Sequence, residues 1–361
     1  MRSKPLADFH VPAIGLGTGV LADDEDAAVA ALREAFSAGL HLVDTAEVYG
    51  DGRAERLIAR AAEGHASVRI ATKISPEHLH PADIRPALDA SLRRLRRDRV
   101  DLYQIHWSNP AVPLAESLGV LEDLAVEGKI GAIGVCNFSM NELREAKSVL
   151  GRVPLAALQA EYNLFDRHVE RDMLPFCEAN RMAFLAYSPL DQGFLCGTAR
   201  GRAVLTEIGR KHGCSAGAIA LAWLARRACV IPIPRSMTAE HIRQNALAGD
   251  LELDAEDLAA IERACGGAPV EVPVDHIRVV PENVGNRKIY ATLDEAKRNI
   301  YGLTPSPAEL ASQISSGDFL KPIRLRPLAD GYYELVEGRI RYWAWVIAFE
   351  GGKPVPALIR E

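Results

Sequence analysis

The stretch Val43-Asp44-Thr45-Ala46-Glu47-Val48-Tyr49-Gly50 follows an apolar run and places a carboxylate and a phenol five residues apart. Two later segments are similar, because each is a short β-type run that ends in polar, titratable residues: Ile70-Ala71-Thr72-Lys73 and Leu102-Tyr103-Gln104-Ile105-His106-Trp107. Strands that deliver these side chains to the same end of a sheet would form a proton-donating site.

Helical and strand patterns alternate outward from this stretch. Residues 9–18 predict a first strand that ends in the turn Gly15-Leu16-Gly17-Thr18-Gly19, and amphipathic helices alternate with β-branched strands from there to residue 264. Such alternation predicts parallel β/α units with right-handed crossovers. About eight units is the count of a closed (β/α)8 TIM barrel. A doubly wound open sheet is the alternative, although it more usually carries a glycine fingerprint after its first strand.

The pattern changes near residue 265, where Gly266-Gly267-Ala268-Pro269 predicts a linker. A strong turn signal at Asp330-Gly331 predicts that the flanking segments 323–326 and 332–336 pair as strands. The remaining expected elements are a strand over 270–277, a loop over 281–287, helices over 308–315 and 339–349, and a last strand over 355–360. The sequence therefore predicts an α/β barrel over residues 1–265 and a small α+β domain over residues 270–361.

Composition excludes several classes of protein. The net charge of −6 gives no overall attraction to nucleic acid or to acidic membranes. The first residues lack the apolar segment of a secretory signal, and no apolar run reaches the ~18 residues of a membrane span. Cytoplasm is the default expectation, with no membrane and no DNA as partner. The basic run Arg93-Arg94-Leu95-Arg96-Arg97 is interpreted as a solvated helix end rather than a nucleic-acid patch.

The six cysteines suggest neither a disulfide framework nor a metal site. None forms a C-x-x-C pair or lies near histidine at a metal-ligand spacing. We therefore expect reduced, mostly buried thiols and no bound metal.

The polar strand ends suggest a specific chemistry. The phenol of Tyr49 is a weak acid, with an ordinary pKa of ~10, and a nearby ammonium lowers that value. Lys73, held in place by Asp44, would supply this ammonium. Tyr49 then becomes a general acid toward a carbonyl oxygen that gains charge as a hydride arrives, and His106 would hydrogen-bond the same oxygen.

These segments resemble those of a known family. Asp44-Thr45-Ala46 with Tyr49-Gly50, Thr72-Lys73 and Gln104-Ile105-His106 are similar to the catalytic segments of the aldo-keto reductase superfamily. Further matches are residues 128–138, with Cys136 where serine is usual, and residues 159–163 and 186–190. The resemblance covers about residues 9–264, and it implies a (β/α)8 barrel that binds a nicotinamide cofactor without a Rossmann domain.

The resemblance also implies a set of cofactor-binding residues, with NADPH favoured over NAD(H). At the nicotinamide end, Asn137 and Gln159 are implied to hold the carboxamide, and Tyr187 to stack on the ring. The pyrophosphate is implied to be covered by Ser188, Leu190, Gln192 and Gly193. At the adenosine end, the implied residues are Arg235 and Ser236 for the 2′-phosphate, His241 where arginine is often found, and Gln244 and Asn245 for the adenine. Gly17 and Thr18 are also implied to contact the cofactor, and Trp107 the substrate. Arginine suits a phosphate because its guanidinium offers a fork of donors.

The chain departs from this family after its last barrel helix. Many members carry a C-terminal tail that folds over the active site, whereas this chain continues into a second domain. Residues 320–326, 331–344 and 354–360 resemble the ParB N-terminal/sulfiredoxin-like domain. That resemblance implies phosphate binding at a helix start by Gly338, Arg339 and Arg341, since free N–H groups and arginine attract anions.

The sequence thus predicts an NADPH-dependent reductase of an aldehyde or ketone, or dehydrogenase of the alcohol, whose added domain helps to form the substrate pocket. Two alternatives stay open. One is a redox-sensing regulatory protein, like the potassium-channel β-subunits built on the same barrel, and the other a bifunctional enzyme with a nucleotide-dependent phosphotransferase activity. The sequence favours no particular carbonyl substrate, reaction direction or oligomeric state.

Overall fold

The computed structural model describes residues 1–265, 269–280, 290–303, 305–316 and 320–360. By their contacts the residues divide into two compact units, residues 1–196 with 202–264, and residues 265–361 with 197–201. No helix in the described ranges combines the length and apolar character that a membrane span requires. The units are described separately below.

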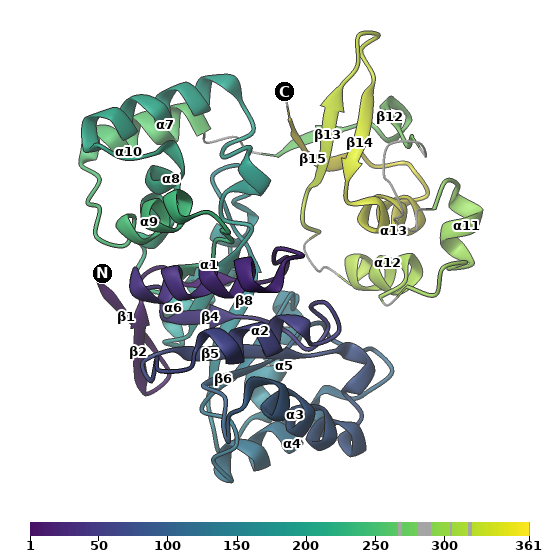
Figure 1. Ribbon diagram of the computed structural model, residues 1–361. Helices are drawn as coiled ribbons and strands as arrows, with labels where there is room; N and C mark the ends of the chain where they lie inside the picture. Colours follow the sequence, from purple (N-terminus) through teal and green to yellow (C-terminus); the bar gives the residue numbers. More distant parts are fainter. Residues whose placement is uncertain (266–268, 281–289, 304, 317–319, 361) are drawn as a thin grey trace. The chain divides into compact units, whose positions relative to one another are not determined.

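The first unit is built on an eight-stranded sheet in the order β10-β9-β8-β7-β6-β5-β4-β3, in which all paired neighbours are parallel. The strands are β3 (Leu16–Gly17), β4 (Leu42–Asp44), β5 (Arg69–Ile74), β6 (Leu102–Ile105), β7 (Ile133–Cys136), β8 (Leu155–Glu161), β9 (Ala183–Tyr187) and β10 (Val230–Pro232) (Figure 1). The predicted α/β class with a parallel sheet is confirmed.

Hydrogen bonds between the first and last strands close this sheet. The amide of Gly15 donates to Pro232 O at 2.9 Å, and that of Gly17 to Pro234 O at 3.0 Å. Gly17 is required here, because a Cβ at this position would lie 2.8 Å from Ile233 O. The glycines of the first turn therefore serve the close approach of two backbones, which glycine alone permits.

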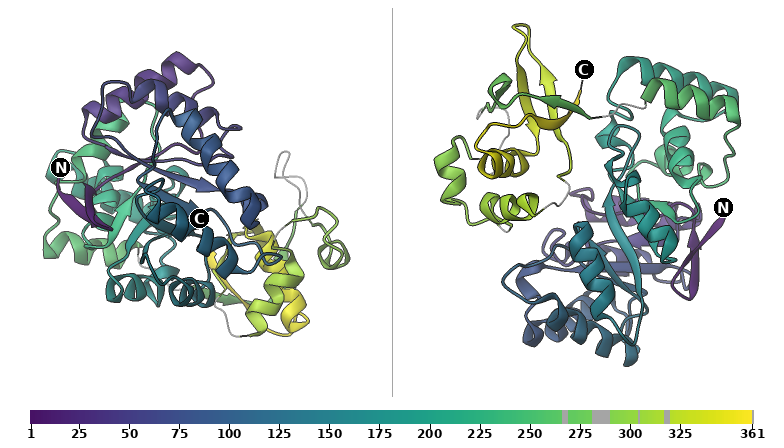
Figure 2. Two further views of the ribbon diagram at one scale, coloured as in Figure 1. Left: turned by 90° about the horizontal axis from the view of Figure 1, so that it is seen from below. Right: turned by 180° about the vertical axis from the view of Figure 1, so that it is seen from behind.

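Helices cover the outside of the strands, as the two views of Figure 2 show. They are α1 (Glu25–Ser37), α2 (Arg53–Ala61), α3 (Pro81–Leu95), α4 (Leu114–Val126), α5 (Met140–Val149), α6 (Met173–Ala179), α7 (Ala199–His212), α8 (Ala216–Ala225), α9 (Ala239–Leu247) and α10 (Ala255–Cys265), with short 3-10 turns η1 (Pro76–His78), η2 (His168–Glu170) and η3 (Asp191–Gly193). Apolar faces position them, as in α1, where Val29, Leu32 and Phe36 are buried.

The chain start differs from the predicted single strand over residues 9–18. An antiparallel hairpin of β1 (Ser3–Leu6) and β2 (Phe9–Pro12) precedes the short β3. Its inner residues Leu6 and Val11 belong to the core cluster that holds Leu42 inside the sheet. Burial of these side chains explains why residues 9–12 leave the parallel sheet and pair with the preceding segment instead.

The second unit has a five-stranded mixed sheet with helices. Its order is β11-β15-β13-β14-β12, with β13 antiparallel to β14 and parallel to β15. The elements are β11 (Val270–Val272), η4 (Val274–His276), β12 (Ile277–Arg278), α11 (Leu293–Lys297), α12 (Pro307–Ser315), β13 (Ile323–Pro327), β14 (Tyr333–Glu337), α13 (Arg339–Phe349) and β15 (Val355–Ile359). The paired strands around Asp330-Gly331 are as predicted, whereas the predicted loop over 281–287 lies outside the described residues.

This unit has its own hydrophobic core. Tyr342, Trp343 and Val346 of α13 pack in one cluster with Ile323 and Leu335 of the sheet. A buried cluster of this kind is what a separate folding domain requires. The predicted strand over 270–277 is interrupted, because β11 ends at Val272 and the η4 turn precedes β12.

The basic run at the end of α3 is only partly a solvated helix end. Arg94 Nε donates to Glu55 Oε2 at 2.6 Å, and Glu55, which is fully buried in α2, also accepts from Thr72 Oγ1 at 2.7 Å. Arg94 thus joins two helices to strand β5. Its neighbour Arg93 is exposed to solvent, as the sequence predicts.

Replacing Arg94 tests this buried ion pair. Arg94→Met should lower the free energy of unfolding by about 3 kcal/mol, because it leaves the Glu55 carboxylate buried without its cation. Arg93→Met is the matched control, on the same helical turn, and should change it by about 0.5 kcal/mol or less. Urea unfolding of both variants measures the difference, and equal stabilities would contradict the structural role of Arg94.

Candidate active site

The polar residues predicted from the sequence lie where parallel strands end. Asp44 is the last residue of β4, Lys73 is next to last in β5, and His106 directly follows β6. Tyr49 lies in the loop between β4 and α2. Because the carboxyl ends of parallel strands meet at the same edge of a closed sheet, the side chains converge there.

Lys73 is the centre of this group. Its Nζ donates to Asp44 Oδ2 at 2.6 Å and to Thr45 O at 2.9 Å, and lies 3.3 Å from the Tyr49 hydroxyl. Lys73 is fully buried and Asp44 is 3% exposed, whereas Tyr49 is half-buried. The ammonium therefore reaches the accessible phenol from a buried position and is held there by a buried carboxylate.

Electrostatics set the protonation of this pair. Burial alone would lower the pKa of Lys73, but the charge and hydrogen bond of Asp44, together with Tyr49 and Cys136, outweigh this effect, so the pKa is raised. The pKa of Tyr49 is also raised, because burial outweighs the lowering effect of Lys73 and Asp44 adds to the rise. The expected lowering by Lys73 is present but does not decide the net direction. Tyr49 therefore holds its proton at neutral pH, as a general acid must.

His106 stands beside the phenol. The rings of His106 and Tyr49 are 5.7 Å apart at their centroids, with an interplanar angle of 82°. Burial, together with the charge of Lys73, lowers the pKa of His106 to about 3. The imidazole is therefore neutral at physiological pH, and it can donate one hydrogen bond to a polar group placed next to Tyr49.

A layer of side-chain amides lies beneath these groups. Gln159 Nε2 donates to Asp44 Oδ1 at 2.7 Å, and Gln104 Nε2 donates to the same oxygen at 3.3 Å. Gln159 Nε2 also lies 3.3 Å from Gln104 Oε1. Gln104 was not among the predicted site residues, although the motif around His106 contained it. The sequence did contain a signal for it: Gln104 lies two residues after the apolar Leu102 in a strand, so both side chains are expected to point into the barrel.

Asn137 and Tyr187 are joined to each other. Tyr187 Oη donates to Asn137 Oδ1 at 2.9 Å, while Asn137 Nδ2 lies 3.2 Å from His106 O and 3.1 Å from Cys136 Sγ. Burial raises the pKa of the Cys136 thiol to about 12, so this group stays protonated. The amide of Asn137 thus connects β7, β9 and the end of β6 at the same edge of the sheet.

The segment predicted to cover a pyrophosphate has an unusual backbone. Ser188, Asp191, Gln192 and Gly193 all have positive φ angles, 47°, 46°, 54° and 95°. Non-glycine residues in this region are strained, which is common where a loop is shaped for a ligand. Leu190 is half-buried, whereas Gln192 and Gly193 are exposed. This segment follows β9 directly and therefore begins at the edge where the polar groups converge.

The residues predicted for the adenosine end lie in the segment between β10 and α9 (Arg235 and Ser236) and on α9 itself (His241, Gln244 and Asn245). Arg235 and His241 are exposed, whereas Ser236 and Asn245 are buried. Gln244 is engaged within the unit, because its Oε1 accepts from the Ser215 amide at 2.8 Å. Gly17 and Thr18 have structural bonds as well: Thr18 Oγ1 donates to Asp44 O at 2.8 Å.

The donor and acceptor set fits a nicotinamide cofactor. Gln159 Nε2 is directed at Asp44 and Gln104, so the amide oxygen Oε1 points away from both, and such an acceptor matches the amino group of a carboxamide. The exposed guanidinium of Arg235, whose Nη1 lies 3.4 Å from Val20 O, has donors to spare for a phosphate. In the described residues no cluster of three or more histidine, cysteine or acidic side chains could hold a metal ion.

Apolar side chains next to the polar groups are exposed. Trp107, which follows His106, is 42% exposed, and Val48, which precedes Tyr49, is 46% exposed. Val20 is 63% exposed and follows Gly19, whose Cβ position lies 3.7 Å from the Tyr49 ring. Three exposed apolar residues are thus sequence neighbours of His106, Tyr49 and Gly19.

In the second unit, the predicted phosphate-binding residues lie at the start of α13. Gly338 caps this helix with φ of 96°. Arg341 Nη1 donates to Pro322 O at 2.7 Å and to Lys321 O at 3.1 Å, and Arg339 Nη2 donates to Val280 O at 3.3 Å. Both guanidinium groups thus already tie the helix start to neighbouring backbone.

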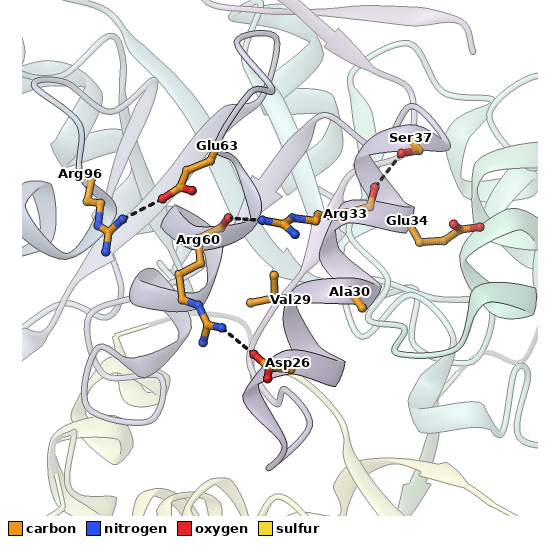
Figure 3. A pocket seen from close by; sticks show the side chains of 9 residues that line it. All are labelled: Asp26, Val29, Ala30, Arg33, Glu34, Ser37, Arg60, Glu63 and Arg96. Carbon is orange, nitrogen blue, oxygen red and sulfur yellow. Dashed lines mark hydrogen bonds and ion pairs between the residues drawn. The ribbon is translucent and has the colours of Figure 1, made fainter.

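A pocket on the outer face of α1 and α2 is lined by charged side chains (Figure 3). Arg60 Nη2 pairs with Asp26 Oδ1 at 2.6 Å, and Arg96 Nη1 pairs with Glu63 Oε1 at 2.8 Å. Arg33 donates to Arg60 O at 3.1 Å. Glu34 pairs with Arg243 of α9, so most of the charges that line this pocket belong to surface ion pairs.

The first unit, with a buried Asp–Lys pair next to a tyrosine and a histidine at the carboxyl end of a closed parallel sheet, has the form of an oxidoreductase barrel. A model of the aldo/keto reductase family matches residues 13–265. The chain is 37% identical over 262 residues to methylglyoxal reductase YeaE of Escherichia coli, covering 71% of this chain and 92% of that protein.

Solved structures agree. The crystal structure of a thermostable aldo-keto reductase, Tm1743, in complex with the inhibitor epalrestat is 36% identical, with a TM-score of 0.69, covering 73% of this chain and all of that chain. An aldo/keto reductase from Klebsiella pneumoniae in complex with NADP and acetate is 35% identical, with a TM-score of 0.66, covering 73% and 95%. The chain belongs to the aldo-keto reductase family. This membership supports a carbonyl-reducing oxidoreductase, and the NADP complex supports NADP use in the family.

The opposing effects of Asp44 and Lys73 on Tyr49 can be separated by substitution. Lys73→Met should raise the pKa of Tyr49 further, because it removes the cation that lowers it, whereas Asp44→Asn should lower that pKa by removing a nearby anion. Each shift should be about one unit. Titration of 13C-tyrosine resonances by NMR measures both, with Tyr49→Phe assigning the signal. Shifts of the same sign in both variants would contradict this arrangement.

Proposed function

We propose that this chain reduces the carbonyl group of an aldehyde or ketone with NADPH, or oxidises the corresponding alcohol, with Tyr49 as general acid and base. The observation that carries the proposal is the buried Asp44–Lys73 pair, whose ammonium lies 3.3 Å from the Tyr49 hydroxyl beside a neutral His106. A nicotinamide cofactor, when bound, supplies or accepts the hydride. All remaining steps are proton and hydrogen-bond chemistry of the chain itself.

In the proposed reduction, a substrate carbonyl oxygen lies between Tyr49 and His106. Negative charge develops on this oxygen as its carbon is reduced. The neutral imidazole donates a hydrogen bond to the oxygen, and Tyr49 transfers its phenolic proton. Lys73 stabilises the phenolate that remains, and Asp44 keeps Lys73 in position. In the oxidative direction the same phenolate accepts the proton of the alcohol.

We assign the cofactor-binding residues on the same basis. The open oxygen of Gln159 and the amide of Asn137 would face the carboxamide, and Tyr187 would stack on the nicotinamide ring. Ser188, Leu190, Gln192 and Gly193 would cover the pyrophosphate, with Gly17 and Thr18 close to the cofactor. Arg235 and Ser236 would bind the 2′-phosphate, which favours NADPH over NADH, and His241, Gln244 and Asn245 would surround the adenosine.

For the substrate we propose a small carbonyl compound with an apolar flank next to Trp107. The exposed Val48, which precedes Tyr49, and the exposed Val20, which follows Gly19, support this choice, because they would add apolar surface near the phenol. Methylglyoxal belongs in the first substrate panel, since the E. coli relative is named a methylglyoxal reductase.

Loss of the phenol tests the proposed acid. Tyr49→Phe should lower kcat/KM by about 10²–10⁴-fold while NADPH still binds. Tyr103→Phe is the matched control: Tyr103 is fully buried, its hydroxyl has no hydrogen-bond partner among the described residues, and its removal should leave turnover unchanged. Stopped-flow and steady-state assays with NADPH and NADH measure both. Wild-type protein that binds NADPH tightly but reduces no member of the panel would contradict the proposal and favour a redox-sensing protein.

We further propose that the second unit, for which we retain the ParB-like assignment, helps to cap the substrate pocket. The family match ends at residue 265, where the second compact unit begins, so this unit follows the barrel at the point where many family members have a substrate-selecting tail. We propose separately that this unit binds a nucleotide phosphate through Gly338, Arg339 and Arg341. Such binding requires the two guanidinium groups to exchange their present carbonyl partners for the phosphate.

Deletion of residues 268–361 tests the proposed cap. KM should rise by about tenfold for bulky carbonyl substrates and less for small ones, because contacts that position the substrate are lost. Circular dichroism and NADPH affinity of the shortened chain confirm that the barrel is intact. Unchanged kcat/KM across the whole panel would contradict a role in the pocket. Calorimetric titration of the full chain with ATP or CTP then tests nucleotide binding independently.

A further inference from the structure

Gln104 has no role in the proton transfer proposed above, yet it is fully buried in the layer beneath it. We infer that Gln104 is a positioning residue that fixes both the Asp44 carboxylate and the amide of Gln159. The inference rests on the proposed function, because these two groups matter as the anchor of Lys73 and as a contact for the cofactor.

The barrel explains why these side chains meet. Asp44, Gln104 and Gln159 lie on β4, β6 and β8, which are alternate strands, and inward side chains of alternate strands form a common layer in such barrels. Two residues earlier on the same strands lie Leu42, Leu102 and Ala157, which belong to the apolar core. The polar layer therefore lies directly on an apolar one, so the polar groups of this layer must form their hydrogen bonds with one another.

The hydrogen bonds give Gln104 two distinct effects. Its amide nitrogen donates to Asp44 Oδ1 at 3.3 Å, while Lys73 binds the other carboxylate oxygen, so the carboxylate is held from both sides. Its carbonyl oxygen accepts from Gln159 Nε2 at 3.3 Å. Since Nε2 of Gln159 is thereby directed at Gln104 and Asp44, Gln159 presents its oxygen to the open side. The orientation of Gln159 thus depends on the acceptor of Gln104.

The neighbouring strand leaves space for this residue. Gln104 is in register with Gly134 of β7, and a Cβ on Gly134 would lie 2.9 Å from Gln104 Cγ. It would also lie 3.1 Å from Leu102 Cδ1. Glycine at this position therefore permits the stem of Gln104 to lie flat against β7, with its amide extended toward Asp44.

Three variants test the inference in the full-length chain. Gln104→Met keeps the volume but loses the donor and the acceptor, so kcat should fall and the Kd of NADPH should rise, each by about tenfold or more. Gly134→Ala leaves the amide in place but displaces it, and should act in the same direction. Leu102→Met, one layer below on the same strand, is the packing control and should change neither quantity by more than about twofold.

Gln104→Glu gives a readout that simple packing would not. The introduced carboxyl, when protonated, donates to Asp44 and accepts from Gln159 as the amide does, whereas its ionised form repels Asp44. Activity and NADPH affinity of this variant should therefore approach the wild-type values at low pH and fall as pH rises. Wild-type protein should show no such dependence over the same range.

The outcomes separate the inference from the function on which it rests. If the wild-type chain neither binds NADPH in fluorescence titration nor reduces a carbonyl, the proposed function fails. If the wild-type chain does both, and Gln104→Met matches the Leu102→Met control while Gln104→Glu shows no new pH dependence, the positioning role alone is refuted. Melting temperatures of all variants accompany each titration, and the pH profile of Gln104→Glu decides if Gln104→Met does not fold.

Discussion

The buried ion pair between Asp44 and Lys73 is the interaction on which the site depends. Burial of either charge alone would be strongly unfavourable, so the chain can hold an ammonium at this depth only with the carboxylate 2.6 Å away and further partners on both sides. The remaining Asp44 oxygen accepts from two amides, and Lys73 also donates to Thr45 O. A cation fixed in this way keeps its charge at all physiological pH values, and it can act on Tyr49 without titrating itself.

The closed sheet is what makes such a pair possible. Alternate strands place their inward side chains in shared layers, so residues separated by more than a hundred positions, such as Asp44 and Gln159, come within hydrogen-bond distance. Closure in turn depends on the backbone contact that Gly17 permits between β3 and the segment after β10. Gly17 is in register with Asp44, so the main-chain contacts that close the sheet lie directly beside the strand that carries this carboxylate.

Much of this arrangement could be predicted from the sequence, and the rest could not for physical reasons. Asp44, Lys73 and His106 follow apolar strand patterns, and parallel strand ends must converge, so their proximity was predictable. The ion pair between Arg94 and the buried Glu55 was not predictable, because a run of arginines at a helix end is usually solvated and only the fold brings Glu55 close to it. The direction in which the pKa of Tyr49 shifts could not be predicted either, since it depends on how far burial outweighs one neighbouring cation. The hairpin at the start of the chain followed from burial of Leu6 and Val11, which strand propensity does not reveal.

In the proposed reaction, the protonation states of Tyr49 and His106 give the two neighbouring rings different roles. Burial raises the pKa of Tyr49 and lowers that of His106, so at neutral pH the phenol and the imidazole are both uncharged donors. If His106 were charged, it would compete with Tyr49 as the proton source and would add a second cation close to Lys73, at a large electrostatic cost. A neutral imidazole can orient a carbonyl oxygen but is a very weak acid, so the phenol is the acid in the reaction that we propose. In the proposed reaction, burial therefore decides which of the two rings transfers the proton.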